Sequence, residues 1–521
     1  MNETRKIGLQ DAFKLATRHH QAGRLAKAEG VYREILRVRP DNAAAHNNLG
    51  KVLQDQGRTD QAIACFKRVL KVKPDLAGAH NNLGNALCEK GKPKEAAVCY
   101  RRAIKIDANY AHAHHNLGNV LKGQGKSDAA VACYKRALAI DPDLAEAHHS
   151  MGNVCQDEGR WADAVKYYSQ ALSLKPDAPE THSSLGNALH RLGRLDEAMV
   201  HLERALSIKP DYPTGHFNKA LADLFTGNYA EGWPGYEWRW RMKRYGKGKR
   251  NFRQPLWDGS PLEGRTIFLH DEQGFGDAIH FVRYASLVER RGGRVVVECR
   301  RQLARLFSTM GAIGEVIARG DPLPAFDVYA PLMSLPHIFR TTAATIPGDV
   351  PYLAAPPEAG PGLPDCPEGT RLRVGIAWAG SRTNTNDRNR SCRLRQFEPL
   401  LSIPGVAFFS LQKDEAAAEL AGTSVRDLSG GLGDFADTAA VVDRLDLVIS
   451  VDTAVVHVAG ALAKPVWVLV PFSPDWRWMR DRDDSPWYPT LRLFRQPALG
   501  DWASVFATVA GELGREAAGR G

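Results

Sequence analysis

Apolar positions repeat with a period of 34 residues over about the first 230 residues of the chain. Within each period they recur at helical spacing in two successive stretches, which predicts a pair of amphipathic helices. A glycine in the middle of each unit is expected to end the first helix. One helix pair cannot bury both of its faces, so we predict that seven units stack into an α-solenoid. The marker glycines are Gly23, Gly57, Gly91, Gly125, Gly159, Gly193 and Gly227.

Histidine recurs at one fixed place in six successive units. A repeated histidine invites interpretation as a metal site, because imidazole is a common metal ligand. Successive units, however, hold these rings too far apart to share one ion. We therefore predict that they pack structurally and that the chain binds no metal. The series is His46, His80, His114, His148, His182 and His216.

Asparagine forms two further ladders along the repeats. It is a poor helix former, so its repeated use on one helix calls for a reason. Side-chain amides that face a groove can bind the backbone of an extended peptide whatever its sequence, whereas the alternative is a solvated helix face. We favour peptide binding. The candidate residues are Asn48, Asn82 and Asn116 in one ladder, and Asn85, Asn119, Asn153 and Asn187 in the other.

After residue 252 strand-like runs alternate with helical stretches, which is typical of parallel α/β sheets. We predict a repeat superhelix at 1–230, a basic aromatic linker at 231–254, and two Rossmann-like lobes at 255–355 and 356–521. Ligands of such sheets bind at the carboxyl ends of the strands, here in the cleft between the lobes. The predicted strands are Thr266–His270, Val295–Glu298, Arg373–Trp378, Val406–Leu411, Asp446–Val451 and Val466–Val470.

Composition narrows the class of protein. The chain has 521 residues, of which 44% are apolar and 25% charged, and this excludes a disordered or fibrous protein. No apolar run reaches the roughly 18 residues that span a bilayer, so we expect a cytoplasmic protein without a transmembrane segment. Residues 237–253 carry eight Lys or Arg and one Glu. Because aromatic residues are mixed into this run, we favour a solvated linker or a landing site for an anionic substrate over nucleic-acid binding.

The first lobe opens with a strand that runs into a glycine-rich loop, Asp271-Glu-Gln-Gly-Phe-Gly-Asp277. Its glycines, Gly274 and Gly276, let the backbone approach a ligand closely, and the helix that follows presents free N–H groups. The loop is neither a P-loop nor a full dinucleotide fingerprint. Asp277 could cap the helix, or it could act as a general base at a strand end that faces a cleft.

The second lobe holds a stronger motif. Leu447-Val-Ile-Ser-Val-Asp-Thr-Ala-Val-Val-His457 indicates a buried strand, a sharp turn and a helix. Asp452 and Thr453 fall at the start of the helix, where N–H groups and the helix dipole favour a diphosphate. Taken singly, Asp452 could cap the helix and His457 could be a packed core residue. Their combination behind a hydrophobic strand favours a ligand site.

These motifs resemble known families. The repeats resemble the tetratricopeptide repeat family, and their asparagine ladder is similar to that of O-linked N-acetylglucosamine transferases. Gly274-Phe-Gly-Asp-Ala-Ile-His280, together with Asp452-Thr-Ala-Val-Val-His457, resembles the heptosyltransferase family of glycosyltransferases, which have the GT-B fold of two Rossmann-like lobes.

The resemblance implies Asp277 as the catalytic base. It also implies that basic residues after the first strand of the second lobe neutralise phosphate. Gln412-Lys413 stands where the family has an acidic residue, and arginine stands where it often has lysine. The residues expected to bind the nucleotide-sugar are Gly274, Gly276, Arg388, Arg390, Gln412, Lys413, Asp452, Thr453, Ala454 and His457.

Repeats joined to such lobes resemble bacterial protein glycosyltransferases, including those that modify flagellin. This implies inverting, metal-independent transfer from a nucleotide-sugar to a hydroxyl of a polypeptide docked by the repeats, with no cofactor besides this co-substrate. Two alternatives stay open: a catalytically inactive adaptor for protein–protein interaction, and a transferase for a glycan or lipid-linked acceptor. The presence of Asp277, Asp452 and His457 in one chain favours the enzyme.

Overall fold

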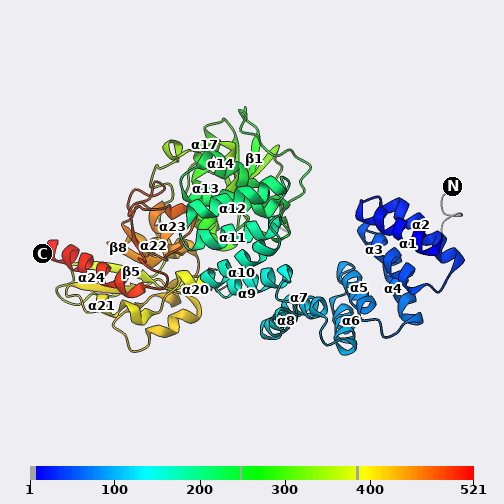
Figure 1. Cartoon of the computed structure of the whole chain (residues 1–521). Helices are drawn as coiled ribbons and strands as arrows, with labels where there is room; N and C mark the ends of the chain where they lie inside the picture. The colour runs from blue at the N-terminus through cyan, green and yellow to red at the C-terminus, as the bar shows by residue number, and fades with distance from the viewer. Residues whose placement is uncertain (1–7, 247–248, 383–385, 521) are drawn as a thin grey trace. The chain divides into compact units, whose positions relative to one another are not determined.

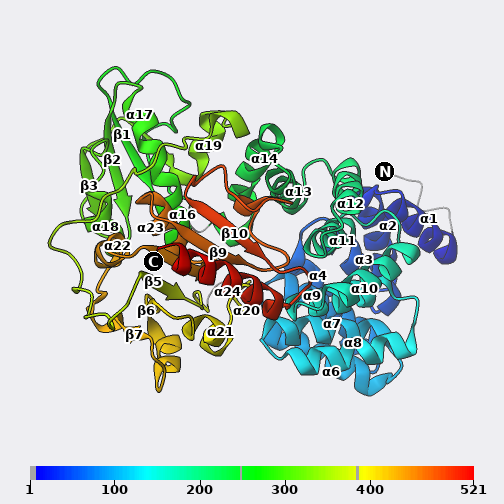
Figure 2. The ribbon, with the colours of Figure 1, turned by 90° about the vertical axis from the view of Figure 1, so that its left-hand side faces the viewer.

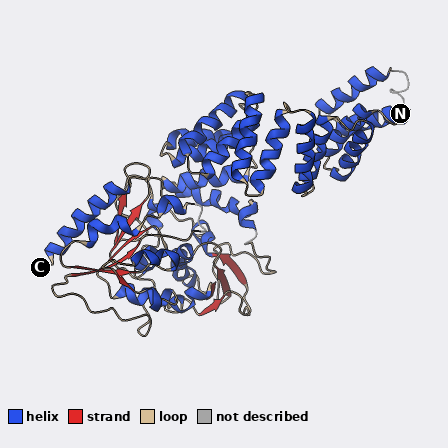
Figure 3. Cartoon of the chain, turned by 90° about the horizontal axis from the view of Figure 1, so that it is seen from below, coloured by secondary structure: helices blue, strands red, loops and turns tan. Residues whose placement is uncertain are grey.

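The computed structural model describes residues 8–246, 249–382 and 386–520. By its contacts the chain divides into two compact units, Met1–Leu189 and His190–Gly521. Helices alone make up the N-terminal part, and all strands belong to the C-terminal part (Figure 3). Among the described residues, no helix combines the length and the apolarity that a membrane span requires.

The predicted helix pairs are present, one after another (blue to green in Figure 1). Their bounds are α1 (Leu9–Gln21), α2 (Leu25–Val38), α3 (Ala43–Asp55), α4 (Thr59–Val72), α5 (Ala77–Glu89), α6 (Pro93–Ile106), α7 (Ala111–Gly123), α8 (Ser127–Ile140), α9 (Ala145–Asp157), α10 (Trp161–Leu174), α11 (Pro179–Arg191), α12 (Leu195–Ile208), α13 (Pro213–Phe225) and α14 (Tyr229–Tyr236). The α-solenoid prediction is confirmed.

Glycine serves the repeats in two ways. The seven marker glycines lie in the turns with φ between +67° and +82°, a conformation that residues with a Cβ rarely adopt. A second glycine lies inside the first helix of several units, where the aromatic residue of the next helix packs on its backbone. A Cβ added to Gly118 would lie 2.5 Å from the ring of Tyr134, and Gly84 has the same relation to Tyr100.

The repeated histidines bond to the backbone. In each of the six units, the ring Nε2 lies 2.8–3.1 Å from the carbonyl oxygen six residues earlier. A carbonyl can only accept, so each ring donates this hydrogen bond. The bond ties the first helix of a unit to the end of the unit before it. The predicted structural role of these residues is confirmed.

Two parallel sheets follow the repeats (Figure 2). The first has the strand order β3-β2-β1-β4, and the second has the order β10-β9-β8-β5-β6-β7. The six predicted strands are all present, and four short or terminal strands join them. The bounds are β1 (Thr266–His270), β2 (Arg294–Cys299), β3 (Glu315–Ala318), β4 (Val328–Pro331), β5 (Leu372–Ala377), β6 (Val406–Ser410), β7 (Arg426–Asp427), β8 (Leu447–Val451), β9 (Val466–Val470) and β10 (Leu491–Arg495).

Helices cover the sheets and begin behind the carboxyl ends of the strands. β1 leads to α16, β8 leads to α23, and β9 leads to the short 3-10 helix η8. The helices of this part are η1 (Glu237–Arg241), α15 (Lys243–Gly246), α16 (Phe275–Phe281), η2 (Val282–Tyr284), α17 (Ala285–Glu289), α18 (Arg301–Phe307), η3 (Leu332–Ser334), α19 (Leu335–Ile338), η4 (Ala343–Thr345), α20 (Asp387–Arg390), η5 (Leu394–Phe397), α21 (Glu398–Leu401), η6 (Asp414–Leu420), η7 (Ser429–Gly431), α22 (Phe435–Asp443), α23 (Ala454–Ala461), η8 (Trp476–Trp478) and α24 (Trp502–Gly519).

The prediction of a solvated linker at 231–254 is wrong for its first part. α14 continues to Tyr236 and η1 follows it directly. Trp233 is 2% exposed and the arginine Arg239 is fully buried. The rings of Trp233 and Tyr236 lie in the core of the α/β half, where Trp233 and Trp476 are 5.2 Å apart at their ring centroids. Residues 247–248 lie outside the described part of the chain.

The same packing moves the boundary between the units. It falls between Leu189 and His190 rather than near residue 230. Phe217 of α13 and Tyr229 of α14 belong to the same buried cluster as residues of both sheets. The last helices of the superhelix therefore share a core with the α/β half.

Candidate active site

The glycine loop behind β1 fixes the position of Asp277. Gly274 is the N-cap of α16, and its N–H donates to Oδ2 of Asp277 over 2.8 Å. The carboxylate thus lies in the first turn of α16, with its side chain 23% exposed. The capping role considered from the sequence is present. It engages one carboxylate oxygen and leaves the other for a second partner.

α16 and α23 meet at their first turns. A Cβ added to Gly276 would lie 2.7 Å from Cδ2 of His457 and 3.7 Å from Cα of Ala454. The glycine is therefore required by a close approach to the ring of His457. This contact brings the glycine loop of one lobe to the helix start of the other, as the location of ligand sites at strand ends implies.

The start of α23 is electrostatically unusual. Thr453 is the N-cap, with Oγ1 3.2 Å from Oγ of Ser450. Nη1 of Arg390 donates to the carbonyl oxygen of Asp452 over 3.0 Å. Burial raises the pKa of Asp452 to about 6, the nearby Asp475 carboxylate adds to this rise, and Arg390 opposes it. A cation and the first N–H groups of α23 therefore meet where the sequence predicts a diphosphate site.

A buried tyrosine connects the two lobes. The hydroxyl of Tyr488 lies 2.9 Å from Nδ1 of His457 and 3.0 Å from Nδ1 of His280. Burial lowers the pKa of both imidazoles well below the ordinary value, so both rings are neutral at pH 7. One hydroxyl can donate to one nitrogen and accept from the other. His457 is thus a packed and hydrogen-bonded residue whose ring also contacts the glycine loop.

Arg477 is the main residue that the sequence analysis missed. It is 5% exposed, and its guanidinium bonds to Oδ1 of Asp277 and to Oδ1 of Asp475, the latter over 2.8 Å. Burial disfavours its charge, but the Asp475 and Asp277 carboxylates outweigh this and hold the pKa of Arg477 above its ordinary value. An arginine between two tryptophans, directly behind the buried strand β9, is the signal that could have identified it.

A second buried ion pair supports the same loop. Glu272 accepts from Nη2 of Arg239 over 2.8 Å, and the Glu272 side chain is 3% exposed. Burial raises the pKa of Glu272 to about 7, and Arg239 opposes this rise. Gln273 donates to the hydroxyl of Tyr236 over 3.0 Å. The segment from Tyr236 to Arg239 therefore supports the glycine loop through hydrogen bonds to Glu272 and Gln273.

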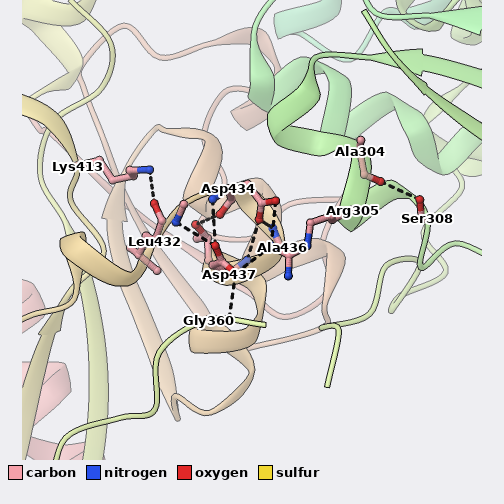
Figure 4. Close-up of polar contacts among 11 residues, drawn as sticks. Ala304, Arg305, Ser308, Gly360, Lys413, Leu432, Asp434, Ala436 and Asp437 are labelled. Carbon is pink, nitrogen blue, oxygen red and sulfur yellow. Dashed lines mark hydrogen bonds and ion pairs between the residues drawn. The ribbon is translucent and has the colours of Figure 1, made fainter. Parts of the chain in front are cut away.

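The remaining predicted nucleotide-sugar residues differ in their availability. Arg388 is exposed on α20. The amide of Gln412 accepts from Trp378 and Ala379 N–H groups over 3.1 Å and 2.9 Å and donates to the carbonyl of Ala379, so it braces the end of β5. Lys413 donates to the carbonyl of Leu432 (Figure 4). Arg388 is thus accessible from solvent, whereas the amide of Gln412 is occupied.

A polar contact joins the lobes at a second place. Nη1 of Arg305, on α18, lies 3.1 Å from a carboxylate oxygen of Asp434 and 3.1 Å from one of Asp437 (Figure 4). Asp437 also accepts from the Gly360 N–H over 3.0 Å. Because Arg305 is 52% exposed, the pair contributes little stability, about 0–1 kcal/mol.

The asparagine ladders are partly used within the superhelix. Tyr134 donates to Asn119, and Tyr100 donates to Asn85, each over 2.8 Å. Asn116 donates to Asn85 over 3.1 Å. Further ladder contacts are Tyr168 to Asn153, Asn187 to Gln156, Asn116 to Asn81, Asn82 to Asn47 and Asn48 to Tyr32.

A pocket of about 400 Å³ lies on these ladders, lined by Asn85, Asn116, Asn119, Tyr100 and Val120 among others. Its walls combine amides with apolar and aromatic groups, which suits a polypeptide segment. Peptide binding stays a prediction. Within the described residues, no group of three or more His, Cys, Asp or Glu side chains is arranged to hold a metal ion.

Known families match both parts of the chain. Residues 31–64 match the tetratricopeptide repeat, five segments between 52 and 222 match the TPR repeat, and residues 405–470 match glycosyltransferase family 9 (heptosyltransferase). The chain therefore carries tetratricopeptide repeats followed by a glycosyltransferase family 9 segment. That segment includes β6, α22, β8, α23 and β9, and with them the predicted diphosphate site.

Protein FlbA of Caulobacter vibrioides is 27% identical over 57% of this chain and 54% of its own length. The chain thus spans about half the length of this curated relative. Among solved structures, MamA is 27% identical with a TM-score of 0.28, and covers 32% of this chain and 92% of its own. A thermophilic TPR protein of Thermus thermophilus is 23% identical with a TM-score of 0.32, and covers 35% and 99%.

Proposed function

We propose that the chain is a glycosyltransferase that moves a sugar from a nucleotide-sugar to a hydroxyl of a protein docked by the repeats. The observation that supports this most is the contact between the first turns of α16 and α23. Gly276 approaches His457 and Ala454 of the other lobe in this contact, and Asp277 is the next residue along α16. This contact supports a general base at Asp277 close to a diphosphate held at the start of α23, which a single displacement requires.

In the proposed reaction Asp277 takes the proton of the acceptor hydroxyl. The oxygen then attacks the anomeric carbon from the face opposite the nucleotide, so the configuration inverts. The nucleotide leaves with the bonding electron pair. Arg388, Arg390 and the N–H groups at the start of α23 stabilise the charge that develops on its phosphate. As the family resemblance implies, no metal ion takes part in the proposed step.

The test is transfer by the full-length chain from labelled sugars carried by UDP, GDP, ADP, dTDP or CMP. Acceptors are candidate proteins, a flagellin-like filament protein among them, and mass spectrometry identifies the modified residue. Asp277→Asn is expected to lower the rate about 100- to 10,000-fold. Asp484→Asn is the matched control, because this exposed carboxylate pairs with Arg482 away from α16. Unchanged transfer by Asp277→Asn would remove this residue from the mechanism.

Docking by the repeats is tested on the same acceptor. Replacing Asn116 and Asn119 by alanine removes two amides from the pocket. We expect the KM for the protein acceptor to rise at least tenfold while the KM for the donor stays unchanged. Equal KM values would argue against docking in this pocket. Failure of all donors, together with retained capture of the protein, would favour the adaptor interpretation.

A further inference from the structure

The segment 471–479, which we name the tryptophan loop, connects three parts of the α/β unit. It follows β9 and contains η8. On one side it contacts α14: Sδ of Met479 lies 3.6 Å from the Tyr229 hydroxyl, and the Trp476 ring lies 5.2 Å from that of Trp233. On the other side Trp478 stacks on His457 of α23, at 5.8 Å between ring centroids.

Arg477 extends from this loop to the proposed base. Its guanidinium is shared between two carboxylates, those of Asp277 and Asp475. The rings of Trp476 and Phe281 flank it, with centroids 4.5 Å and 5.3 Å away. Its Nε is buried without a hydrogen-bond partner among the described residues. A buried arginine held in this way cannot turn to water if it loses its carboxylates.

This sharing bears on proton transfer. When a base takes up a proton it loses its charge, and a buried cation that depended on it alone would be left uncompensated, which is strongly unfavourable. Arg477 has Asp475 as a second partner. Neutralising Asp277 therefore leaves one ion pair intact.

We propose that Arg477 and Asp475 are positioning residues for Asp277. Arg477 holds Oδ1 while the N–H of Gly274 holds Oδ2, so the carboxylate is fixed in direction. The proton passes from the acceptor hydroxyl to Asp277, the bond from that oxygen to the anomeric carbon forms, and the bond to the phosphate breaks. The Asp475 carboxylate then compensates the positive charge of Arg477 until Asp277 releases the proton. This inference rests on the proposed function.

A stability cycle tests the shared ion pair without any substrate. Urea unfolding of the full-length chain is followed by tryptophan fluorescence, because ten of its eleven tryptophans lie in 190–521. Asp277→Asn and Asp475→Asn each leave Arg477 one carboxylate, whereas the double variant leaves none. We expect the double variant to lower the urea midpoint by about 1 M more than the two single variants do when their decreases are added.

The cycle has a matched control. Asp475→Asn also removes contacts other than the one with Arg477. Their loss lowers the midpoint equally whether residue 277 is Asp or Asn, so it cancels in the cycle. Asp277→Asn combined with Asp484→Asn is expected to be additive, since Asp484 pairs with the separate Arg482. Additive shifts in the Asp277 and Asp475 cycle would overturn the sharing of Arg477.

Kinetics test the positioning role with the nucleotide-sugar that the donor screen identifies. Arg477→Gln is expected to lower kcat at least tenfold with an unchanged KM for the donor, and Arg477→Lys to recover part of the loss. Asp475→Asn is expected to lower kcat in the same way. A raised donor KM with unchanged kcat would mean that these residues bind the donor, which would overturn the inference. If no donor is used, the proposed function fails, and the unfolding cycle still decides whether Arg477 is shared.

Discussion

The two halves of the molecule place their polar contacts at very different sequence separations. In the repeats, Tyr134 donates to Asn119, 15 residues away, and Asn116 donates to Asn81, 35 residues away. In the α/β half, Arg477 bonds to a carboxylate 200 residues away, and His280 bonds to a tyrosine 208 residues away. The repeats are therefore stabilised by copies of a local contact, whereas the lobe junction depends on single, long-range contacts.

The largest expected effect is at the brace under the glycine loop. Arg239→Met removes the partner of the buried Glu272 and also a donor to Ser334. Breaking one side of a buried ion pair costs about 3–5 kcal/mol. We expect a loss of this size in the unfolding transition that tryptophan fluorescence reports.

Arg241→Met is the control for this change. Arg241 lies two residues further on and pairs with Asp211, with side chains 51% and 72% exposed. An exposed pair of this kind contributes about 0–1 kcal/mol. Equal losses in the free energy of unfolding for the two variants would contradict a buried ion pair at Arg239 and would support a solvated linker.

Acid is expected to destabilise both halves through buried imidazoles. Burial lowers the pKa of four imidazoles of the α/β unit, to about 3 for His190 and about 4 for His270. The unfolded chain binds these protons near pH 6.5, whereas the folded chain does not, so stability falls as the pH drops below about 6.5. The other two are His280 and His457.

Four carboxyls of this unit act in the opposite direction. Burial raises the pKa of Glu272 to about 7 and that of Asp452 to about 6, and it also raises the pKa of Asp223 and of Asp271. These carboxyls add stability as the pH falls towards about 4.

Between pH 6.5 and pH 5 the tryptophan transition should shift to lower urea. The helical signal of the repeats should shift as well, because burial also lowers the pKa of two imidazoles there, those of His115 and His149. A tryptophan transition that does not move over this pH range would contradict neutral buried imidazoles in the α/β unit.

Within the repeats, the close contact of a glycine with an aromatic ring predicts a moderate effect. Gly118→Ala places a Cβ 2.5 Å from the ring of Tyr134, and such overpacking costs about 1–3 kcal/mol. Far-ultraviolet circular dichroism should report the loss, with little change in the tryptophan transition. Gly123→Ala is the control, because no atom lies within 4 Å of its added Cβ. There the reduced freedom of the unfolded chain should stabilise by about 0.4–1 kcal/mol.

The smallest effect concerns the tyrosine hydroxyls of the asparagine ladder. Tyr100→Phe, Tyr134→Phe and Tyr168→Phe each remove one hydrogen bond of 2.7–2.8 Å to the asparagine of the same unit. We expect each to cost about 1 kcal/mol in the helical transition. The three losses should agree within about 0.5 kcal/mol, since the contact is a copy. A single dominant loss would show that the units are not equivalent.

The same difference in separation explains what the sequence could predict. The helix pairs follow from the 34-residue period, and the six long strands follow from their apolar runs. β3, β4 and β7 have four, four and two residues, which is too short for a pattern to stand out. The solvated-linker prediction was wrong because it took the high net charge of the segment to mean that its side chains are exposed to solvent. Arg239 is instead buried with carboxylate partners.

At the candidate site, topology was predictable and individual contacts were not. The strand-to-helix motifs at Asp277 and Asp452 correctly indicated two helix starts behind parallel strands. The sequence could not show that Arg477 bonds to Asp277, because the two residues are 200 positions apart and neither local motif predicts a contact with the other. Nor could it show that the amide of Gln412 is occupied by backbone groups of β5.

The shared core of the last helices limits how this protein can change in length. Phe217 and Tyr229 are buried in the same cluster as Trp487, so deleting α13 or α14 would open an apolar wall beside both sheets. Among the described residues, this cluster includes none before Leu195. Gene duplication or loss can therefore lengthen or shorten the superhelix, one 34-residue step at a time, only on its N-terminal side.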